Sequence, residues 1–325
     1  MPFEAGVDEL PTDGNESGKS HHLQILNYIT LIIFTFGCIG NILIIFYFTK
    51  IDRKKKKSMT AYHFLITVLA ILDWNVCAMK IVKTALMVIY HNERMKINLM
   101  MEKVLHLLST YFYGCLTATS IYILVIISFL RYQRITNPFR PAWNKSIYFM
   151  LCFLSWCLCT GIWLFVFFVK FAKSWLLDPI VIGVFPLIML CFFYYKMFKS
   201  LKTNHNNNRN SRKSKESISR SSSTIIANDQ TKERNMVALR TVKYLIVVYF
   251  VTVVLVKIVL YSFVVPPEME MENFLLYESY VDFFYMINNM ANVLVYAKLI
   301  CGFRCFLKKF FTCGRMVKSN SASSI

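Results

Sequence analysis

The sequence predicts an all-α membrane protein, a bundle of seven transmembrane helices followed by a short amphipathic eighth helix. The first observation is composition, because 56% of the 325 residues are hydrophobic and only 17% are charged. The second is patterning: the charges sum to a formal +19, yet they are gathered between long uncharged runs. A soluble chain of this length would carry more charge. Both observations predict that lipid surrounds most of the chain.

Seven apolar runs are long enough to cross a bilayer, whose hydrocarbon core of about 30 Å needs roughly 20 helical residues. We expect helices over residues 23–49, 58–89, 102–134, 146–170, 179–200, 236–264 and 274–299. The bundle then occupies residues 23–300 and leaves residues 1–22 as a tail. An odd number of crossings places the two ends of the chain on opposite sides of the membrane.

The distribution of basic residues predicts the orientation. Lys50 and residues 54–57 follow the first run, and many more bases lie between the fifth and sixth runs, whereas residues 4–16 carry acids. The positive-inside rule then predicts a multi-pass plasma-membrane protein with an extracellular amino terminus. The bases suit anionic inner-leaflet lipid, and nucleic acid is not an expected partner. Asn15 begins an Asn-Glu-Ser sequon in the tail and is a predicted glycosylation site.

Residues 201–235 differ in composition from the runs around them. Residues 204–210 are mostly Asn and residues 217–224 mostly Ser, with bases between them, so we expect a disordered cytosolic loop. The hydroxyls beside bases are either phosphorylation sites or part of a merely solvated loop. None of the ten cysteines falls in an expected outside loop, so we expect no disulfide.

The chain beyond the seventh run predicts a helix on the membrane surface. In residues 301–313, Phe and Leu alternate with Arg and Lys, as in an amphipathic helix that lies in the interface. Cys313 is either a palmitoylation site or an inert thiol. Residues 314–325 are expected to form a cytosolic tail, in which Ser323-Ser324-Ile325 fits a PDZ-domain ligand.

Polar side chains within the apolar runs indicate a functional interior. Asp73 stands alone in the second run, and burying such a charge in lipid is costly unless a partner or a water cavity relieves it. In the seventh run, inward-facing positions recur at intervals of four, three and four: Tyr285, Asn289, Asn292 and Tyr296. With Asp73, this stripe forms either a network that holds water or a small cation, or ordinary hydrogen bonds between helices. The predicted network consists of Asn41, Asp73, Ser120, Asn288 and Asn292.

Short motifs also recur in a fixed order along the runs. They are Gly40-Asn41 in the first run, Leu-Ala-x-x-Asp ending at Asp73 in the second, Arg131-Tyr132 with Pro138 after the third, Trp156 in the fourth, Pro186 and Tyr194 in the fifth, and Asn-Val-Leu-Val-Tyr over residues 292–296 in the seventh. This ordered set resembles the rhodopsin-like (class A) G-protein-coupled receptors. The chain resembles a divergent member from about residue 23 to residue 313, outside the fifth-to-sixth loop.

The resemblance implies roles for these positions. Arg131 and Tyr132 would engage a heterotrimeric G protein when the sixth helix moves outward, and Tyr194 and Tyr296 would support that open state. In inactive family members an allosteric sodium ion is held by residues that match Asp73, Ser120, Asn288 and Asn292. No other metal or cofactor is expected, and the implied partners are the G protein, an extracellular ligand and arrestin.

Several positions depart from the family pattern. Leu130 stands where the family has an acid before the arginine, and Asn235 lies near the place of an acid in the sixth helix. We therefore expect no charge-paired lock on Arg131 and appreciable signalling without ligand. Val253-Val254-Leu255 replaces Cys-Trp-x-Pro, and Val293 replaces the seventh-helix proline. The sixth helix therefore lacks the usual cause of its kink.

The outer halves of the helices predict the ligand pocket. Its expected lining is Lys80, Lys83, Tyr113, Lys257, Glu278 and Asp282. Bases on the second and sixth helices opposite acids on the seventh either suit a ligand with both signs of charge, such as a peptide, or pair with each other. Tyr113 stands where amine receptors carry an aspartate, and Met286 where opsins carry the retinal-binding lysine. We therefore favour a peptide over a monoamine or retinal.

Three other functions explain fewer of these sequence features than a receptor does. The six histidines form no cluster with carboxylates at membrane depth, so we do not expect an enzyme. A transporter would need paired broken helices, and we find no internal repeat. A non-signalling seven-helix scaffold or decoy would explain the altered motifs and stays open as an alternative.

Overall fold

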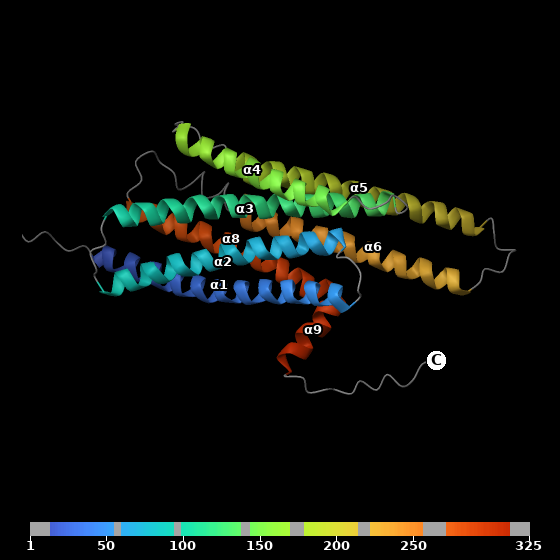
Figure 1. Ribbon diagram of the computed structural model, residues 1–325, viewed down its shortest axis with the longest axis horizontal. Helices are drawn as coiled ribbons and strands as arrows, with labels where there is room; N and C mark the ends of the chain where they lie inside the picture. Colours follow the sequence, from blue (N-terminus) through green and yellow to red (C-terminus); the bar gives the residue numbers. More distant parts are fainter. Residues whose placement is uncertain are drawn as a thin grey trace, which may run out of the picture.

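The computed structural model describes residues 14–54, 60–93, 99–137, 144–169, 179–213, 222–255 and 271–312. The helices are α1 (Gly14–Lys54), α2 (Ala61–Glu93), α3 (Leu99–Thr136), α4 (Lys145–Val169), α5 (Phe185–Lys213), α6 (Ser222–Tyr249), α8 (Met271–Leu299) and α9 (Cys301–Phe311). The structure also describes two π-helical segments, η2 (Pro179–Val184) directly before α5 and η3 (Phe250–Leu255) directly after α6. Figure 1 shows α1 to α8 lying side by side along the longest axis, with α9 leaving the bundle.

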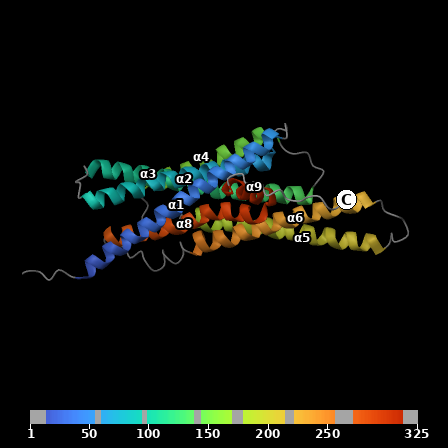
Figure 2. The ribbon, with the colours of Figure 1, turned by 90° about the horizontal axis from the view of Figure 1, so that it is seen from below.

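The bundle confirms the predicted all-α fold, with α8 as its seventh helix and α9 as the amphipathic helix. α1 packs against α2 and α8, and α3 contacts α2, α4 and α5. α6 lies between α5 and α8, and the second view shows these three helices together along one side (Figure 2). The bundle is thus closed, because its first and last long helices, α1 and α8, are neighbours.

Within the described part, four helices are each long and apolar enough to span a membrane. The spans are Ile25–Lys50, Ala61–Ala85, Phe112–Thr136 and Asn235–Leu255. A fifth results if Met286–Leu299 and Cys301–Phe311 count as one broken span, although a bend of 100° separates them. Ser146–Ile162 in α4 is apolar but shorter. Several spans in one packed bundle make the chain a multi-pass membrane protein.

The helices extend beyond their expected bounds in two places. α1 begins at Gly14, inside the segment 1–22 that we expected as a tail. α5 continues to Lys213 and α6 begins at Ser222, so both enter residues 201–235, which we expected to be disordered. The physical reason is that elongation adds a hydrogen bond per residue without a new nucleation step. Polar turns can therefore continue a helix that an apolar run has begun.

The surface and interior of the bundle reverse the pattern of a soluble protein. Phe46, Phe149 and Met150 are 62%, 63% and 69% exposed, whereas Asp73 and Asn289 are fully buried. Large apolar side chains spread over a whole surface indicate that a lipid phase covers it. The polar side chains have turned inward, where they can only satisfy one another or bound water.

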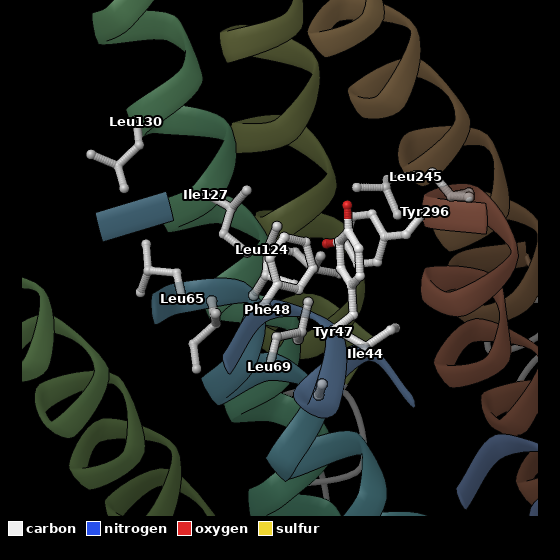
Figure 3. Close-up of a cluster of buried hydrophobic side chains, with 14 of the residues drawn as sticks. Ile44, Tyr47, Phe48, Leu65, Leu69, Leu124, Ile127, Leu130, Leu245 and Tyr296 are labelled. Atoms are coloured by element: carbon white, nitrogen blue, oxygen red, sulfur yellow. The ribbon is translucent and has the colours of Figure 1, made fainter. Parts of the chain in front are cut away.

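A buried apolar cluster separates the polar interior from the end of the bundle at which Arg131 lies, called here the Arg131 end. Figure 3 shows side chains of this cluster meeting between the helices. They include Ile44, Tyr47 and Phe48 of α1, Leu65 and Leu69 of α2, Leu124, Ile127 and Leu130 of α3, Leu245 of α6 and Tyr296 of α8. α9 is attached to the same cluster, because Phe303 is fully buried and its ring lies 5.2 Å from that of Tyr47.

The two π-helical segments lie at facing positions, η2 directly before α5 and η3 directly after α6. η2 and η3 contact each other, and the Tyr249 hydroxyl, just before η3, donates a hydrogen bond of 3.1 Å to the Gly183 carbonyl of η2. Thr252, Val253 and Val254 of η3 are buried. A π-helical turn loosens the regular ladder and is a recognised cause of helix kinks. Helix six therefore has a local irregularity where the sequence offers no proline.

Candidate functional site

Asp73 and Asn292 form the centre of a buried polar site between α2 and α8. The Asn292 Nδ2 group donates a hydrogen bond of 2.8 Å to Asp73 Oδ2. Ser120 of α3 lies near this carboxyl group, and its hydroxyl donates to the Thr117 carbonyl at 3.0 Å. Asp73 and Ser120 are at most 1% exposed and Asn292 is 3% exposed. Three helices thus contribute polar groups to one buried position.

The polar interior holds more hydrogen-bonding capacity than its described neighbours satisfy. Atoms without a hydrogen-bond partner among the described residues include Asn41 Oδ1, Asp73 Oδ1, Asn288 Nδ2, both amide atoms of Asn289 and the Tyr296 hydroxyl. An unsatisfied buried polar atom costs about 1–3 kcal/mol, and bound water commonly removes that cost. The interior is therefore suited to bind water or another polar guest.

Among the described residues, Asn41 and Asn288 lie in this interior without a direct hydrogen bond to Asp73. The Asn41 amide group donates to the Gly37 carbonyl of its own helix at 3.0 Å, and Asn288 lies one turn before Asn292 on α8. α1 can approach α8 closely because residue 40 is glycine: a Cβ there would lie 2.8 Å from Val293 Cγ1. The first and last helices therefore bring their asparagines into one interior.

Arg131 is held by neutral groups of two other helices. Its Nη1 donates a hydrogen bond of 2.8 Å to the Ala238 carbonyl of α6, and its Nη2 donates to the Tyr62 hydroxyl of α2. The guanidinium carbon also lies 4.8 Å from the centre of the Tyr62 ring. Across the described residues, no acid pairs with Arg131, and Leu130 beside it is buried in the apolar cluster.

The tyrosines predicted to act with Arg131 lie around it in different environments. The Tyr132 ring stacks on Phe193 of α5 with 6.1 Å between centres. Tyr194 packs beside a small buried cluster that includes Met197 and Leu239. Tyr296 is 1% exposed and packs in the apolar cluster.

A cavity of about 640 Å³ opens at the Arg131 end. Its lining comes from α1, α2, α3, α4, α6, α8 and the start of α9, and includes Tyr62, Arg131, Arg134, Glu233, Asn235 and Ala238. The contact between Arg131 and Ala238 lies on the wall of this cavity. A displacement of α6 would therefore both break that contact and widen the cavity.

The predicted ligand residues on α2 and α3 meet in the opposite half of the bundle. Lys80 and Lys83 are 2% and 7% exposed, and Tyr113 is 9% exposed. The Lys80 ammonium group lies 3.9 Å from the centre of the Tyr113 ring, a cation–π contact that partly offsets the cost of burying the charge. Two buried lysines one turn apart make this half of α2 a cationic interior surface.

Other predicted residues lie outside the described part of the structure. Lys257 and Cys313 fall in segments that it does not describe. Asn15, Glu278 and Asp282 belong to helices, but their side chains are not described. The structure therefore leaves the sixth- and seventh-helix side of the pocket, the sequon and the palmitoylation site as predictions.

Sequence reasoning did not identify several residues that join the helices at these sites. Tyr62 and the Ala238 carbonyl bind Arg131, and Tyr249 links α6 to η2. A backbone carbonyl leaves no trace in side-chain identity, and tyrosines near the ends of membrane helices are common for interfacial reasons. The absence of acids beside Arg131 was the available signal, since a half-buried guanidinium must find other acceptors.

The family comparison matches the first part of the chain. Residues 40–175 match the model of the 7 transmembrane receptor (rhodopsin family), while no curated protein matches the chain. The matched segment contains Asn41, Asp73 and Arg131, and the structure joins it to the remainder through the Asp73–Asn292 and Arg131–Ala238 contacts. Members of this family are signalling receptors rather than enzymes. The match over residues 40–175 and the seven-helix bundle together support a seven-transmembrane receptor of the rhodopsin family.

Proposed function

We propose that this receptor binds an extracellular ligand and activates a heterotrimeric G protein through outward movement of α6. In this proposal the protein lies in the plasma membrane with its amino terminus outside, so the Arg131 end faces the cytosol. The observation that carries the proposal is the contact between Arg131 and the Ala238 carbonyl on the wall of the cavity. When α6 moves away, Arg131 loses this acceptor and becomes available to a cytosolic partner.

The proposal is tested by guanine-nucleotide exchange in cells. The chain is expressed with a panel of G-protein biosensors, and basal exchange is compared with that of cells lacking it. We expect raised exchange on at least one G protein and its loss on substitution Arg131→Ala. If Arg131→Ala leaves every output unchanged, a non-signalling scaffold is favoured, and substrate flux without exchange would favour a transporter.

We propose that the ligand is a peptide whose acidic group binds near Lys80 and Lys83. The support is the burial of two lysines on one face of α2 together with the Tyr113 ring. Lys257, Glu278 and Asp282 extend the same pocket in this proposal, with the acids placed to receive the basic groups of the peptide. Opposite charges at the two ends of the pocket would orient a bound peptide.

Peptide and lipid libraries applied to cells that express the chain test this ligand class. A peptide agonist should lose potency on substitution Lys83→Met, which keeps the length of the side chain and removes its charge. The matched control is Lys196→Met, because Lys196 is exposed on α5. Equal potency on both variants, or agonists that carry no acid, would contradict the proposed pocket.

We also propose that the polar interior binds a sodium ion in the inactive state. The residues fit a small hard cation, since carboxylate, hydroxyl and carboxamide oxygens are suitable ligands and Asp73 Oδ1 has no described hydrogen-bond partner. Within the described chain, no group of three or more His, Cys, Asp or Glu side chains could hold a metal, so the amides and Ser120 would complete the site. When bound, the ion would stabilise whichever receptor state binds it better.

Thermal unfolding in sodium chloride and in choline chloride tests this site. Sodium should raise the unfolding temperature of the purified receptor and should not do so for Asp73→Asn. A sodium effect of equal size in Asp73→Asn would exclude Asp73 as its origin. Arrestin and a PDZ-domain protein remain proposed partners that the described residues do not address.

A further inference from the structure

Near the Arg131 end, the contacts of α6 with α3 and α8 include no pair of opposite charges among the described residues. The Ala238 carbonyl accepts from Arg131 of α3, and Lys298 of α8 lies 4.7 Å from the centre of the Tyr244 ring. In both contacts a cation meets a neutral group. Such contacts are weaker than buried ion pairs and more easily exchanged, so the position of each cation decides how firmly α6 is held.

Tyr62 is fixed in the first turn of α2 by the residue before the helix. The Thr60 hydroxyl accepts a hydrogen bond of 3.3 Å from the His63 amide group, and the Thr60 carbonyl accepts one of 2.9 Å from the Phe64 amide group. This is the arrangement of an N-cap. The His63 ring lies 5.0 Å from that of Phe48, which ties the same turn to α1. The backbone at Tyr62 is therefore anchored both by the N-cap and by the contact with α1.

The Tyr62 side chain offers Arg131 two separate interactions. Its hydroxyl accepts a hydrogen bond from Nη2, and its ring lies 4.8 Å from the guanidinium carbon. The other terminal nitrogen, Nη1, remains directed at the Ala238 carbonyl of α6. One planar guanidinium thus joins α2 to α6, and its two terminal nitrogens bind one partner each.

We propose that Tyr62 is the positioning residue that holds Arg131 against α6, at a site where no described residue gives Arg131 a carboxylate partner. Tyr62 binds the guanidinium in an orientation from which Nη1 reaches the Ala238 carbonyl. Without Tyr62, Arg131 is free to turn toward the cavity and the Ala238 contact weakens. The effect on signalling rests on the proposed function, whereas the effect on the position of α6 does not.

The position of α6 is tested directly on the full-length purified receptor in nanodiscs, without ligand or G protein. Spin labels are introduced as noncanonical amino acids at Arg240 of α6 and Asn144 before α4, both exposed, so that native cysteines do not interfere. The distance distribution should show one main population. In Tyr62→Leu a longer-distance population should rise roughly fivefold, a typical size for such coupling.

Two further variants separate the parts of the Tyr62 side chain and control for the loss of a tyrosine. Tyr62→Phe keeps the ring and loses the hydroxyl, so its longer-distance population should lie between those of the parent and Tyr62→Leu. This variant also serves if Tyr62→Leu fails to fold. Tyr195→Leu removes a tyrosine that is 58% exposed on α5 and should leave the distances unchanged. Identical distributions in Tyr62→Phe, Tyr195→Leu and the parent would overturn the proposal.

Basal nucleotide exchange of the same variants separates this inference from the proposed function. If both hold, exchange should rise from the parent through Tyr62→Phe to Tyr62→Leu. Altered distances without exchange on any G protein would leave the role of Tyr62 intact and remove the proposed function. The opposite result is also informative. If the parent promotes exchange, but the two Tyr62 variants change neither the distances nor the exchange, the proposed function stands and the role of Tyr62 is overturned.

Discussion

Gly40 is a residue whose small size decides how closely two helices approach. A Cβ at this position would lie 2.8 Å and 2.9 Å from the two methyl groups of Val293, well inside contact distance. The same approach brings α1 to the helix that carries Asn288 and Asn292. A side chain at residue 40 should therefore disturb the polar interior as well as the local packing.

We predict that Gly40→Ala lowers the stability of the purified receptor by about 1–3 kcal/mol, the usual cost of overpacking. Thermal unfolding in detergent measures the effect. Gly161→Ala is the matched control, because it lies in α4 and a Cβ there would meet nothing within 4 Å. We expect that control to be neutral or slightly stabilising, since alanine favours helix over glycine by about 1 kcal/mol.

Val293→Ala completes the test of this contact. Combined with Gly40→Ala, it should recover part of the lost stability, so the two changes should be non-additive. Strict additivity would show that the cost of Gly40→Ala arises elsewhere.

How far single residues could be predicted depends on whether their side chains carry the interaction. The contact between Asp73 and Asn292 could be predicted, because an isolated carboxylate needs a partner and the seventh-helix spacing directs amides inward. The hydrogen-bond partners of Arg131 could not be predicted in this way. One is a backbone carbonyl of α6, and the other is a tyrosine that resembles many interfacial tyrosines. The sequence indicated only that Arg131 lacked acids, and the structure identifies what replaces them.

At the scale of elements, the paired π-helical segments are the feature that the sequence did not predict. Apolar runs predict where a helix lies, but a π-helical turn changes the local hydrogen bonds without changing that pattern. The same limit applies to the polar turns at Lys213 and Ser222, whose composition suggested a loop while helix elongation continued through them. Predictions from composition are therefore strongest in the middle of each span and weakest at its ends and irregularities.

We predict that Tyr249→Phe loosens η2 and η3 together. The change removes the hydrogen bond to the Gly183 carbonyl, which costs about 0.5–1.5 kcal/mol. Hydrogen exchange followed by mass spectrometry should show faster exchange over residues 179–184 and 250–255. Tyr280→Phe is a suitable control, because Tyr280 is 43% exposed on α8. Faster exchange confined to one segment would mean that the hydrogen bond does not couple the two.

At the scale of the whole molecule, the charge distribution and the bundle together specify how the chain lies in a membrane. The helices carry apolar side chains outward, and α9 turns from α8 by 100° at the Arg131 end, as an interfacial helix would. Phe310 and Phe311 of α9 are exposed while Lys308 and Lys309 lie beside them. This combination suits a surface where acyl chains meet anionic headgroups.

We predict that the amino terminus is extracellular and the carboxyl terminus cytosolic. An epitope tag before Met1 should be stained on intact cells, whereas a tag after Ile325 should require permeabilisation. Asn15→Gln should abolish a glycan-dependent shift in electrophoretic mobility, because only a luminal or extracellular sequon is modified. The physical cause is the retention of basic loops in the cytosol, so replacing Lys54 to Lys57 with glutamine should produce a fraction of molecules with the carboxyl tag outside. Staining of the carboxyl tag on intact cells in the parent chain would reverse the assigned orientation and place Arg131 beyond the reach of any G protein.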